Sequence, residues 1–467
     1  RNKMMHDTLI LCCHEGVKNP KQAFGNLFAQ VDYLCKVHDI KIADKIAIQT
    51  MRRHSNKQEP LSEEDLKYDA RALAIFISAV CQTDIPHELT VLIPHTNRPY
   101  QKGLDISNRR IRCIVKNWDS DFIHVDIDHD TDEEEHLVCL KDEANGIDHT
   151  YLCEILEEGM QLNLLDCQIR QPVITPRLII VEPDYLIDIS SIAACFTEFG
   201  HHPLLYLLNL MKPRANTQAT LLGNFAGAAL DDIINSHGKY QVNETIKSNF
   251  REKALEFCTC PWFDAKKFYT DANLQAYNLQ QVVDILFPRT ASQAQMNAFR
   301  GEGIYDRKKA ILEPSFVCEA LGIQGRVDLM TTDCKLLVEQ KSGRNLNIEN
   351  HQADPNYHSF QLVPHYVQLL LYYGVLQHNF KLGNNLVNIR LLYSKYQPQN
   401  GLMVVAYYQK LFREAIEYRN QLVAASFEIA KKGFEHALNE FTPDVLNVAG
   451  TQDFFYNKYL KPQLADI

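Results

Sequence analysis

The stretch GRVDLMTTDCKLLVEQKSG, residues 325–343, combines two apolar runs with three charges in the spacing D-x10-E-x-K. The two runs predict a short β-hairpin that turns near residues 332–333. Side chains at i and i+2 share one face of a strand, so Glu339 and Lys341 project together from the second strand. Asp328 belongs to the first strand, across the turn. The pattern therefore predicts two carboxylates and an ammonium group on one face of the hairpin.

This combination of charges favours metal-dependent chemistry on phosphates. Two carboxylates are hard oxygen ligands and suit Mg²⁺ or Mn²⁺. Such an ion lowers the pKa of bound water and neutralises charge that develops on a phosphate. Lys341 would then position the water or stabilise the phosphate. The same charges on a solvent-facing strand would serve solubility alone, and the bare spacing arises by chance in roughly one chain in ten of this length.

The segments around the hairpin predict an α/β core. Residues 309–319, 324–332 and 334–341 are three strand-like runs, and residues 388–396 and 402–409 are two more. A helix is predicted between these groups, over 364–377. Gln368 and Tyr372 lie four residues apart in it, so they share one helix face and can reach the same place.

Length and periodicity predict several domains, because 467 residues exceed one compact core. Apolar spacing of three and four predicts an N-terminal helical domain over 1–95. A period near two predicts a small β domain over 96–182, a barrel or sandwich, with an OB-like barrel as an attractive form. The expected fold continues with an α/β core over 183–410, a mixed sheet flanked by helices. A helical extension is expected over 411–467.

Composition bounds the class of protein. The shares of hydrophobic residues (46%) and charged residues (23%) are ordinary for a soluble globular protein. No apolar run has the length of a membrane span, so no membrane contact is predicted. The 13 cysteines are odd in number and scattered, which predicts reduced thiols in a cytoplasmic protein. The net charge of −10 argues against polyanion binding by the whole surface but allows a local basic path.

Taken in order, these residues resemble the PD-(D/E)xK nuclease superfamily. The closest resemblance is to its RecB-like branch, which includes the Okazaki-flap helicase-nucleases and the CRISPR-associated RecB-like nucleases. GRVD, EQK and QLLLY are similar to the successive motifs of that branch, and the resemblance covers about residues 181–410. It implies a metal-dependent deoxyribonuclease acting on DNA ends, flaps or single strands, in replication, repair or antiviral defence. The chain has no G-x-x-x-x-G-K-[ST] loop, so we expect a helicase motor elsewhere in a longer protein.

The resemblance also implies a role for each matching residue. Asp328 and Glu339 would bind Mg²⁺ or Mn²⁺ together with the main-chain carbonyl of Gln340. Lys341 would serve the attacking water or the phosphate. Gln368 and Tyr372, which match the helix motif, would orient the active site or the substrate strand.

The first helix of the branch departs from the pattern here. It usually reads G-x-x-x-H, and the histidine is a metal ligand. Gly223 is in place, but Gly227 occupies the ligand position. Asp231, one turn or about 5.4 Å further on, is a candidate replacement, and so is its neighbour Asp232. Acidic residues on an exposed helix surface explain the pair at least as well.

Cysteine positions argue against two cofactors. Many relatives hold an iron–sulfur cluster, with one cysteine before the nuclease core and three after it. Cys195 lies near the first position, but no cysteine follows Cys334, so the four thiolates that a cluster needs are missing. Cys258 and Cys260 have the wrong spacing for zinc and no second pair. We therefore predict neither an iron–sulfur cluster nor zinc.

Basic residues near the core are candidate DNA contacts. Arg344 extends the lysine motif. Arg307, Lys308 and Lys309 precede the first core strand, where they would contact a phosphate backbone or simply form a solvated strand entry.

Three hypotheses follow: a metal-dependent nuclease, a degenerate nuclease-fold module that binds DNA or partner proteins, and a structural scaffold. The scaffold leaves Asp328 and Glu339 apart. The module brings them together but has no metal site, because Gly227 removes the third ligand.

Overall fold

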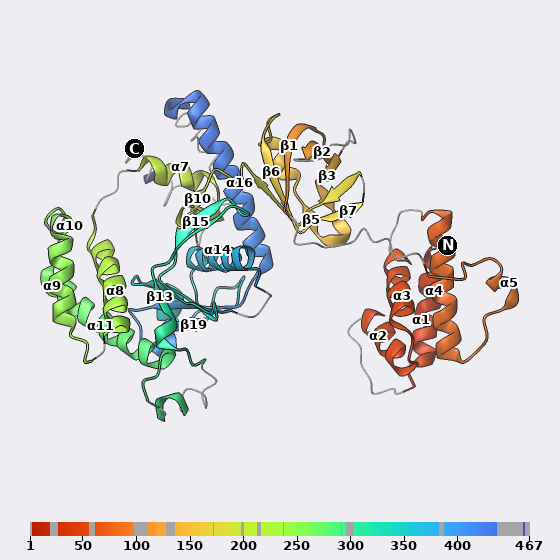
Figure 1. The fold of residues 1–467 in the computed structure, drawn as a ribbon, viewed down its shortest axis with the longest axis horizontal. Helices are drawn as coiled ribbons and strands as arrows, with labels where there is room; N and C mark the ends of the chain where they lie inside the picture. The colour runs from red at the N-terminus through yellow and green to blue at the C-terminus, as the bar shows by residue number, and fades with distance from the viewer. Residues whose placement is uncertain are drawn as a thin grey trace. The chain divides into compact units, whose positions relative to one another are not determined.

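A computed structural model of the chain shows two compact units, residues 1–104 and 105–467 (Figure 1). The structure describes residues 2–18, 27–55, 61–97, 110–127, 136–170, 172–197, 200–212, 216–236, 238–290, 292–295, 303–382, 387–436 and 461–462. In these parts of the chain, no helix combines the length and hydropathy needed to cross a bilayer.

The first unit is helical. Its elements are α1 (Asn2–Gly16), α2 (Leu27–Val37), α3 (Ile42–Ser55), α4 (Glu63–Cys81) and α5 (His87–Thr90). The side chain of Ser62 accepts a hydrogen bond from the main-chain N–H of Asp65 at 3.0 Å, which caps α4. Apolar side chains of α1 to α4, among them Leu9, Leu34 and Phe76, form the core of this unit.

A seven-stranded sheet begins the second unit, in the order β7-β8-β3-β2-β1-β6-β9. Its strands are β1 (Ile111–Trp118), β2 (Phe122–Ile127), β3 (His136–Cys139), β6 (Gln161–Leu165), β7 (Gln168–Arg170), β8 (Val173–Thr175) and β9 (Leu178–Val181), and β4 (Lys141–Asp142) pairs with β5 (Ile147–Asp148) beside them. The outer strands β7 and β9 do not pair with each other in the described residues, so the expected barrel closure is wrong.

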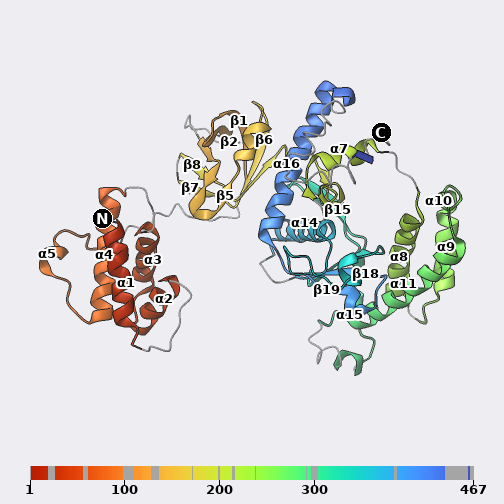
Figure 2. The ribbon, with the colours of Figure 1, turned by 180° about the vertical axis from the view of Figure 1, so that it is seen from behind.

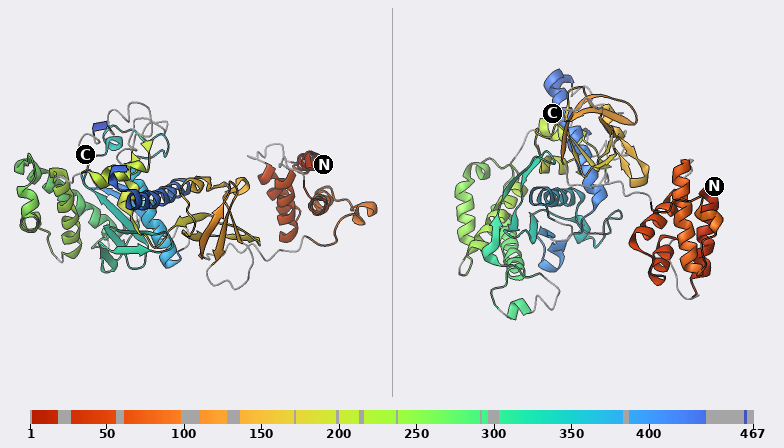
Figure 3. Two further views of the ribbon diagram at one scale, coloured as in Figure 1. Left: turned by 90° about the horizontal axis from the view of Figure 1, so that it is seen from above. Right: turned by 45° about the vertical axis from the view of Figure 1, so that its right-hand side comes forward.

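The outer edge of β9 is covered by a helix and not by another strand, which is why the sheet stays open. Helix α16 (Gln409–Lys432) contacts β9, and Figure 3 shows this blue helix next to the yellow strands of the β domain. The side chain of Asn420 accepts from the N–H of Val181 at 3.0 Å and donates to the carbonyl of Ile179 at 2.7 Å. A helix side chain thus takes the hydrogen bonds that a closing strand would have made.

The rest of the second unit is a mixed α/β structure, which confirms the expected multidomain α/β class. Its five-stranded sheet has the order β13-β16-β17-β18-β19, with β17 and β18 parallel and the other pairs antiparallel. The strands are β13 (Ala310–Leu312), β16 (Leu329–Thr331), β17 (Leu336–Lys341), β18 (Asn388–Tyr393) and β19 (Leu402–Val404). A three-stranded sheet adjoins it and contains β10 (Ile187–Asp188), β15 (Ile323–Arg326) and β14 (Ser315–Cys318).

Helices cover both faces of the five-stranded sheet (Figures 1 and 2). One face packs against α8 (Gln218–Asn235) and α11 (Ala265–Leu286) through Leu336 and Val338, and the other packs against α14 (Val363–Phe380) and α16 through Leu337. The remaining elements are α6 (Ile189–Ala193), β11 (Phe196–Thr197), β12 (Gly200–His201), α7 (Leu204–Met211), α9 (Val242–Glu252), α10 (Ala254–Cys258), α13 (Leu346–Glu349) and α15 (Pro398–Gly401).

Two of the expected strands are broken, and both breaks lie beside the hairpin. The run 309–319 divides into β13 and β14, and the run 324–332 into β15 and β16, with each half in a different sheet. Glu313 has a positive φ of 47°, and Pro314 has no N–H to donate. The two neighbouring segments stay paired through the bend, because the N–H of Glu313 donates to the carbonyl of Asp328 at 2.9 Å. Asp328 therefore lies where the chain passes from one sheet to the other.

The expected boundary at residue 410 falls within a helix. Helix α16 crosses it, and Leu411, Phe412, Ile416 and Leu422 belong to the same apolar core as α14. This part of the predicted extension completes the core. Residues 437–460 lie outside the described part of the chain.

Candidate functional site

The hairpin brings Asp328 and Glu339 together as its periodicity predicts. In the antiparallel pair of β16 and β17, Leu329 lies opposite Val338. One further step in this register places Asp328 opposite Glu339. The main-chain N–H of Gln340 donates to Oδ2 of Asp328 at 2.5 Å, which fixes that carboxylate against β17.

Glu339 is the buried centre of the site, with 3% of its surface exposed. Its Oε1 accepts from Nζ of Lys341 at 2.8 Å and from Nε2 of Gln368 at 2.6 Å. Nζ of Lys341 also donates to Oε1 of Gln368 at 2.8 Å, which closes a ring of three side chains. The other oxygen of Glu339, Oε2, is buried and has no hydrogen-bond partner among the described residues.

Burial and like charge control the electrostatics of this pair. Burial, followed by the negative charge of Asp328, raises the pKa of Glu339 to about 8, against the opposing effect of Lys341. Burial also raises the pKa of Asp328, although the hydrogen bond from Gln340 opposes it. A divalent cation would stabilise the ionised form of two such buried carboxylates.

Helix α8 presents one face to this group. A Cβ atom on Gly223 would lie 3.3 Å from Oγ of Ser342, directly after β17, so the helix and the strand approach closely there. Two turns further on, burial and the charges of Glu313 and Asp328 raise the pKa of Asp231 to about 7. Gly227 lies between them, and a Cβ atom there would meet nothing within 4 Å.

The neighbouring acid, Asp232, has a different role. Its Oδ2 accepts a hydrogen bond of 2.5 Å from the hydroxyl of Thr245 on α9. This bond joins two helices, and Asp232 itself is exposed. Of the two candidates on α8, Asp231 is therefore the one whose charge acts on the site.

Glu313 is an acidic neighbour of the site that sequence reasoning missed. It follows β13 directly, its charge raises the pKa values of Asp231 and Asp328, and its Oε2 lies 3.1 Å from Nη1 of Arg326. The only signal in the sequence was a glutamate before a proline inside a predicted strand.

A second missed group lies under the ends of β17 and β18. Gln275 and Asn278 of α11 are 1% exposed. The amide of Gln275 donates to the carbonyl of Ser342 at 3.1 Å, and its oxygen accepts from the hydroxyl of Ser394 at 2.6 Å. Gln340 donates to the same hydroxyl at 2.7 Å. This network holds the strand that carries Glu339 and Lys341 against α11.

Tyr372 positions the site from the core. Its hydroxyl donates to the carbonyl of Arg326 at 2.6 Å, and its ring lies so close that a Cβ atom on Gly325 would approach it to 3.0 Å. The side chain is 3% exposed. Of the two roles predicted for Tyr372, this geometry supports orientation of the segment before Asp328 and gives no contact surface for a substrate strand.

The residues predicted to contact DNA differ in their surroundings. The guanidinium of Arg307 donates to the carbonyls of Ile234 at 2.7 Å and Ser236 at 3.1 Å and so caps the end of α8. Its contact with DNA stays a prediction, and a phosphate would have to compete with these carbonyls. Lys309 pairs with Asp333 at 3.0 Å. Lys308 is exposed, and its contact with DNA stays a prediction.

Arg344 is also engaged within the chain. Its Nε lies 3.0 Å from Oε2 of Glu349. Hydrogen bonds from Arg344, Tyr396 and Lys395 lower the pKa of Glu349 to about 2. A phosphate would have to compete with this carboxylate for Arg344.

The carboxylate oxygens of the site are the kind of ligand that a divalent cation prefers, but fewer than three of these side chains converge on one point. In the described parts of the chain, no three histidine, cysteine, aspartate or glutamate side chains converge closely enough to hold a metal ion. Oε2 of Glu339 is nevertheless a buried carboxylate oxygen without a partner, and such oxygens need a hydrogen bond or a cation. No known protein-family model matches the sequence, and neither does any curated protein.

Proposed function

We propose that residues 183–432 form a divalent-metal-dependent nuclease core that cleaves phosphodiester bonds in DNA ends, flaps or single strands. The observation that carries this proposal is the free oxygen of Glu339. This residue is 3% exposed, and one of its carboxylate oxygens accepts hydrogen bonds from Lys341 and Gln368. The other oxygen makes no hydrogen bond with any described residue. A solubilising charge would lie in solvent, so burial at this position supports a chemical role.

Asp328, Glu339 and the main-chain carbonyl of Gln340 would hold Mg²⁺ or Mn²⁺, with Asp231 as the further oxygen donor from α8. When bound, such an ion lowers the pKa of coordinated water and neutralises charge on the phosphate. Glu313 adds negative charge at the same place and would strengthen the attraction for a cation.

Lys341 would contribute a positively charged hydrogen-bond donor to the site, which would stabilise the phosphate or position the attacking water. Its side chain is 21% exposed, so Nζ is reachable from solvent while Glu339 and Gln368 hold it in place. From this position it would donate to a phosphate oxygen or to the attacking water. Gln368 bridges the lysine and the glutamate and keeps both in register.

A second candidate function is a nuclease-fold module that binds DNA or partner proteins without cleaving DNA. Two observations favour it: the open space at Gly227, and the lack of a three-ligand group in the described residues. In this alternative, Lys341 and Glu339 form a structural ion pair.

The two functions differ in a cleavage assay with end-labelled single-stranded and flapped DNA. Wild type should cut in Mn²⁺ or Mg²⁺ and stop in EDTA, and Lys341→Ala should lower the rate by about 100-fold or more. Lys335→Ala is the matched control, because Lys335 is exposed just before the same strand. Cutting that persists in Lys341→Ala would refute the nuclease site. DNA binding without cutting in any metal would establish the module instead.

A further inference from the structure

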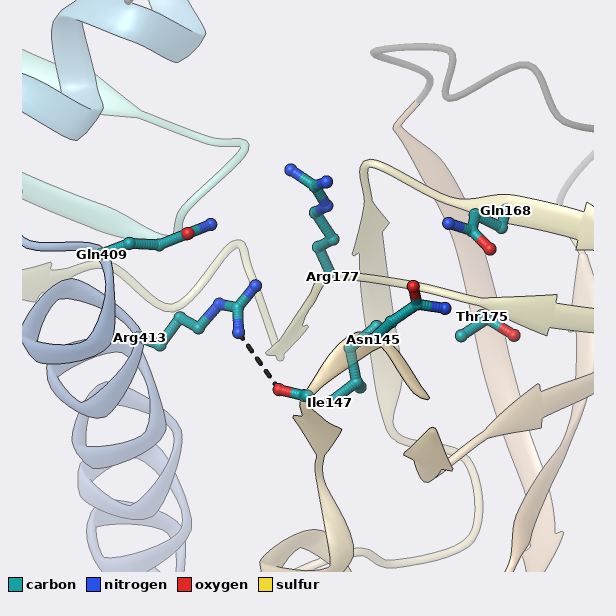
Figure 4. A pocket seen from close by; sticks show the side chains of 8 residues that line it. Asn145, Ile147, Gln168, Thr175, Arg177, Gln409 and Arg413 are labelled. Atoms are coloured by element: carbon teal, nitrogen blue, oxygen red, sulfur yellow. Dashed lines mark hydrogen bonds between the residues drawn. The ribbon is translucent and has the colours of Figure 1, made fainter. Parts of the chain in front are cut away.

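A polar pocket of about 280 Å³ lies where the β domain meets the beginning of α16. Gln409 and Arg413 extend into it from α16, and Asn145, Gln168 and Thr175 come from the β domain, with Arg177 between the two groups (Figure 4). No residue of the acidic site lines this pocket.

Six of the eight lining residues have a side chain that can donate a hydrogen bond, and none of the eight carries a carboxylate. Nη1 of Arg413 donates to the carbonyl of Gly146 at 3.2 Å, which fixes its guanidinium at the wall (Figure 4). The side chain of Arg177 makes no ion pair or hydrogen bond with any other described residue and is exposed. All its guanidinium donors are thus available to a ligand.

The carboxylates near Arg413 do not form ion pairs with it. One of them is Glu417, whose pKa burial and the charges of Glu414 and Asp148 raise to about 7, while the charge of Arg413 opposes this shift. None of these three acids forms an ion pair with Arg413 within 4.0 Å in the described structure. The positive charge of the pocket is therefore not cancelled by a direct partner.

We propose that this pocket binds a phosphate group, presented by a nucleic-acid strand or by a free nucleotide. Guanidinium groups donate paired, parallel hydrogen bonds that match the oxygens of a phosphate, and amide and hydroxyl groups complete such a shell. The volume accommodates a phosphate with an attached sugar but excludes a folded partner. The proposal rests on this pocket alone and does not depend on nuclease activity.

The test is binding by the full chain in EDTA, which prevents metal-dependent cleavage. Fluorescence anisotropy with labelled oligothymidylate and competition by thymidine 5′-monophosphate or inorganic phosphate separate the two sources. Arg177→Gln should weaken binding of the probe by about 10-fold. Arg413→Gln should do the same, and Arg170→Gln is the control, because Arg170 is exposed on β7 outside the pocket.

Each outcome is decisive. Weaker oligonucleotide binding by Arg177→Gln, with no displacement of the probe from wild type by thymidine 5′-monophosphate or phosphate, assigns the pocket to a strand. Displacement of the probe from wild type, with weaker probe binding by Arg177→Gln, shows that the pocket also takes a free nucleotide or phosphate. Equal affinities of Arg177→Gln, Arg170→Gln and wild type for every probe would overturn the proposal. Arg177 is exposed, so its replacement tests binding without endangering the fold.

Discussion

Replacing Glu339 by glutamine should stabilise the metal-free protein while abolishing its activity. In EDTA, the carboxyl group has a pKa of about 8 in the folded chain and about 4.5 in the unfolded chain. At this carboxyl group the folded state therefore binds more protons between these values, and the contribution of Glu339 to the free energy of unfolding falls as pH rises through this range. At pH 7 the carboxyl group is ionised in the unfolded chain and protonated in the folded chain. This difference lowers the free energy of unfolding by about 3 kcal/mol relative to low pH, at 1.36 kcal/mol for each pH unit above 4.5.

Glu339→Gln removes this cost and keeps the shape of the side chain. We expect it to raise the free energy of unfolding at pH 7 by about 1–3 kcal/mol, because some contact with Lys341 is lost. The assay is urea unfolding in EDTA at pH 5, 7 and 8, where the difference from wild type should grow with pH. Glu154→Gln, at an exposed glutamate, should change stability by less than about 0.5 kcal/mol. A less stable Glu339→Gln, or an unchanged pH dependence, would refute the reasoning.

Three further predictions test other parts of the structure. Gly227→His should raise Mn²⁺ affinity about ten-fold, because a Cβ atom at this position meets open space beside the site. Gly223→His should not raise it, because Ser342 lies close to that position. Equal Mn²⁺ affinities of the two variants would contradict this prediction. Arg419→Met should lower the free energy of unfolding by about 3 kcal/mol or more, because the buried guanidinium of Arg419 donates to four main-chain carbonyls. Urea unfolding measures this loss, and a midpoint equal to that of wild type would contradict the prediction. Burial lowers the pKa of His149 to about 4, so the contribution of His149 to the free energy of unfolding should fall by about 2 kcal/mol between pH 7 and pH 5. The stability of wild type relative to His149→Phe should fall by this amount over that range, and an unchanged difference would exclude this histidine as the cause.

The core of the candidate site follows from local rules that a sequence displays. Alternation along a strand puts Glu339 and Lys341 on one face, and a short turn puts Asp328 opposite them. Helical spacing adds Gln368 from α14. These relations span few residues or a regular period, so no tertiary information is needed to expect them. The observed hydrogen bonds join Lys341 to Glu339 and Gln368, and the main-chain N–H of Gln340 holds Asp328 beside them.

The rest depends on where the chain bends and what packs against it. Glu313 joins the site only because one predicted strand breaks and passes between two sheets, an event marked by no more than Pro314. Arg307 looked available for phosphate until the end of α8 supplied carbonyls for it. The open edge of β9 likewise depends on Asn420, more than 200 residues away in the chain. Such partners are set by tertiary packing, and local patterns do not contain them.

The most direct test of the central claim is a titration of the metal-free chain with Mn²⁺, followed by calorimetry or by electron paramagnetic resonance. We expect one Mn²⁺ site, which is lost in Asp328→Asn and in Glu339→Gln. Asp232→Asn should retain the site, because that side chain bonds to Thr245 on α9. Mn²⁺ binding that survives both substitutions, or its absence from the wild type, would contradict the claim that Asp328 and Glu339 form the metal site of a nuclease.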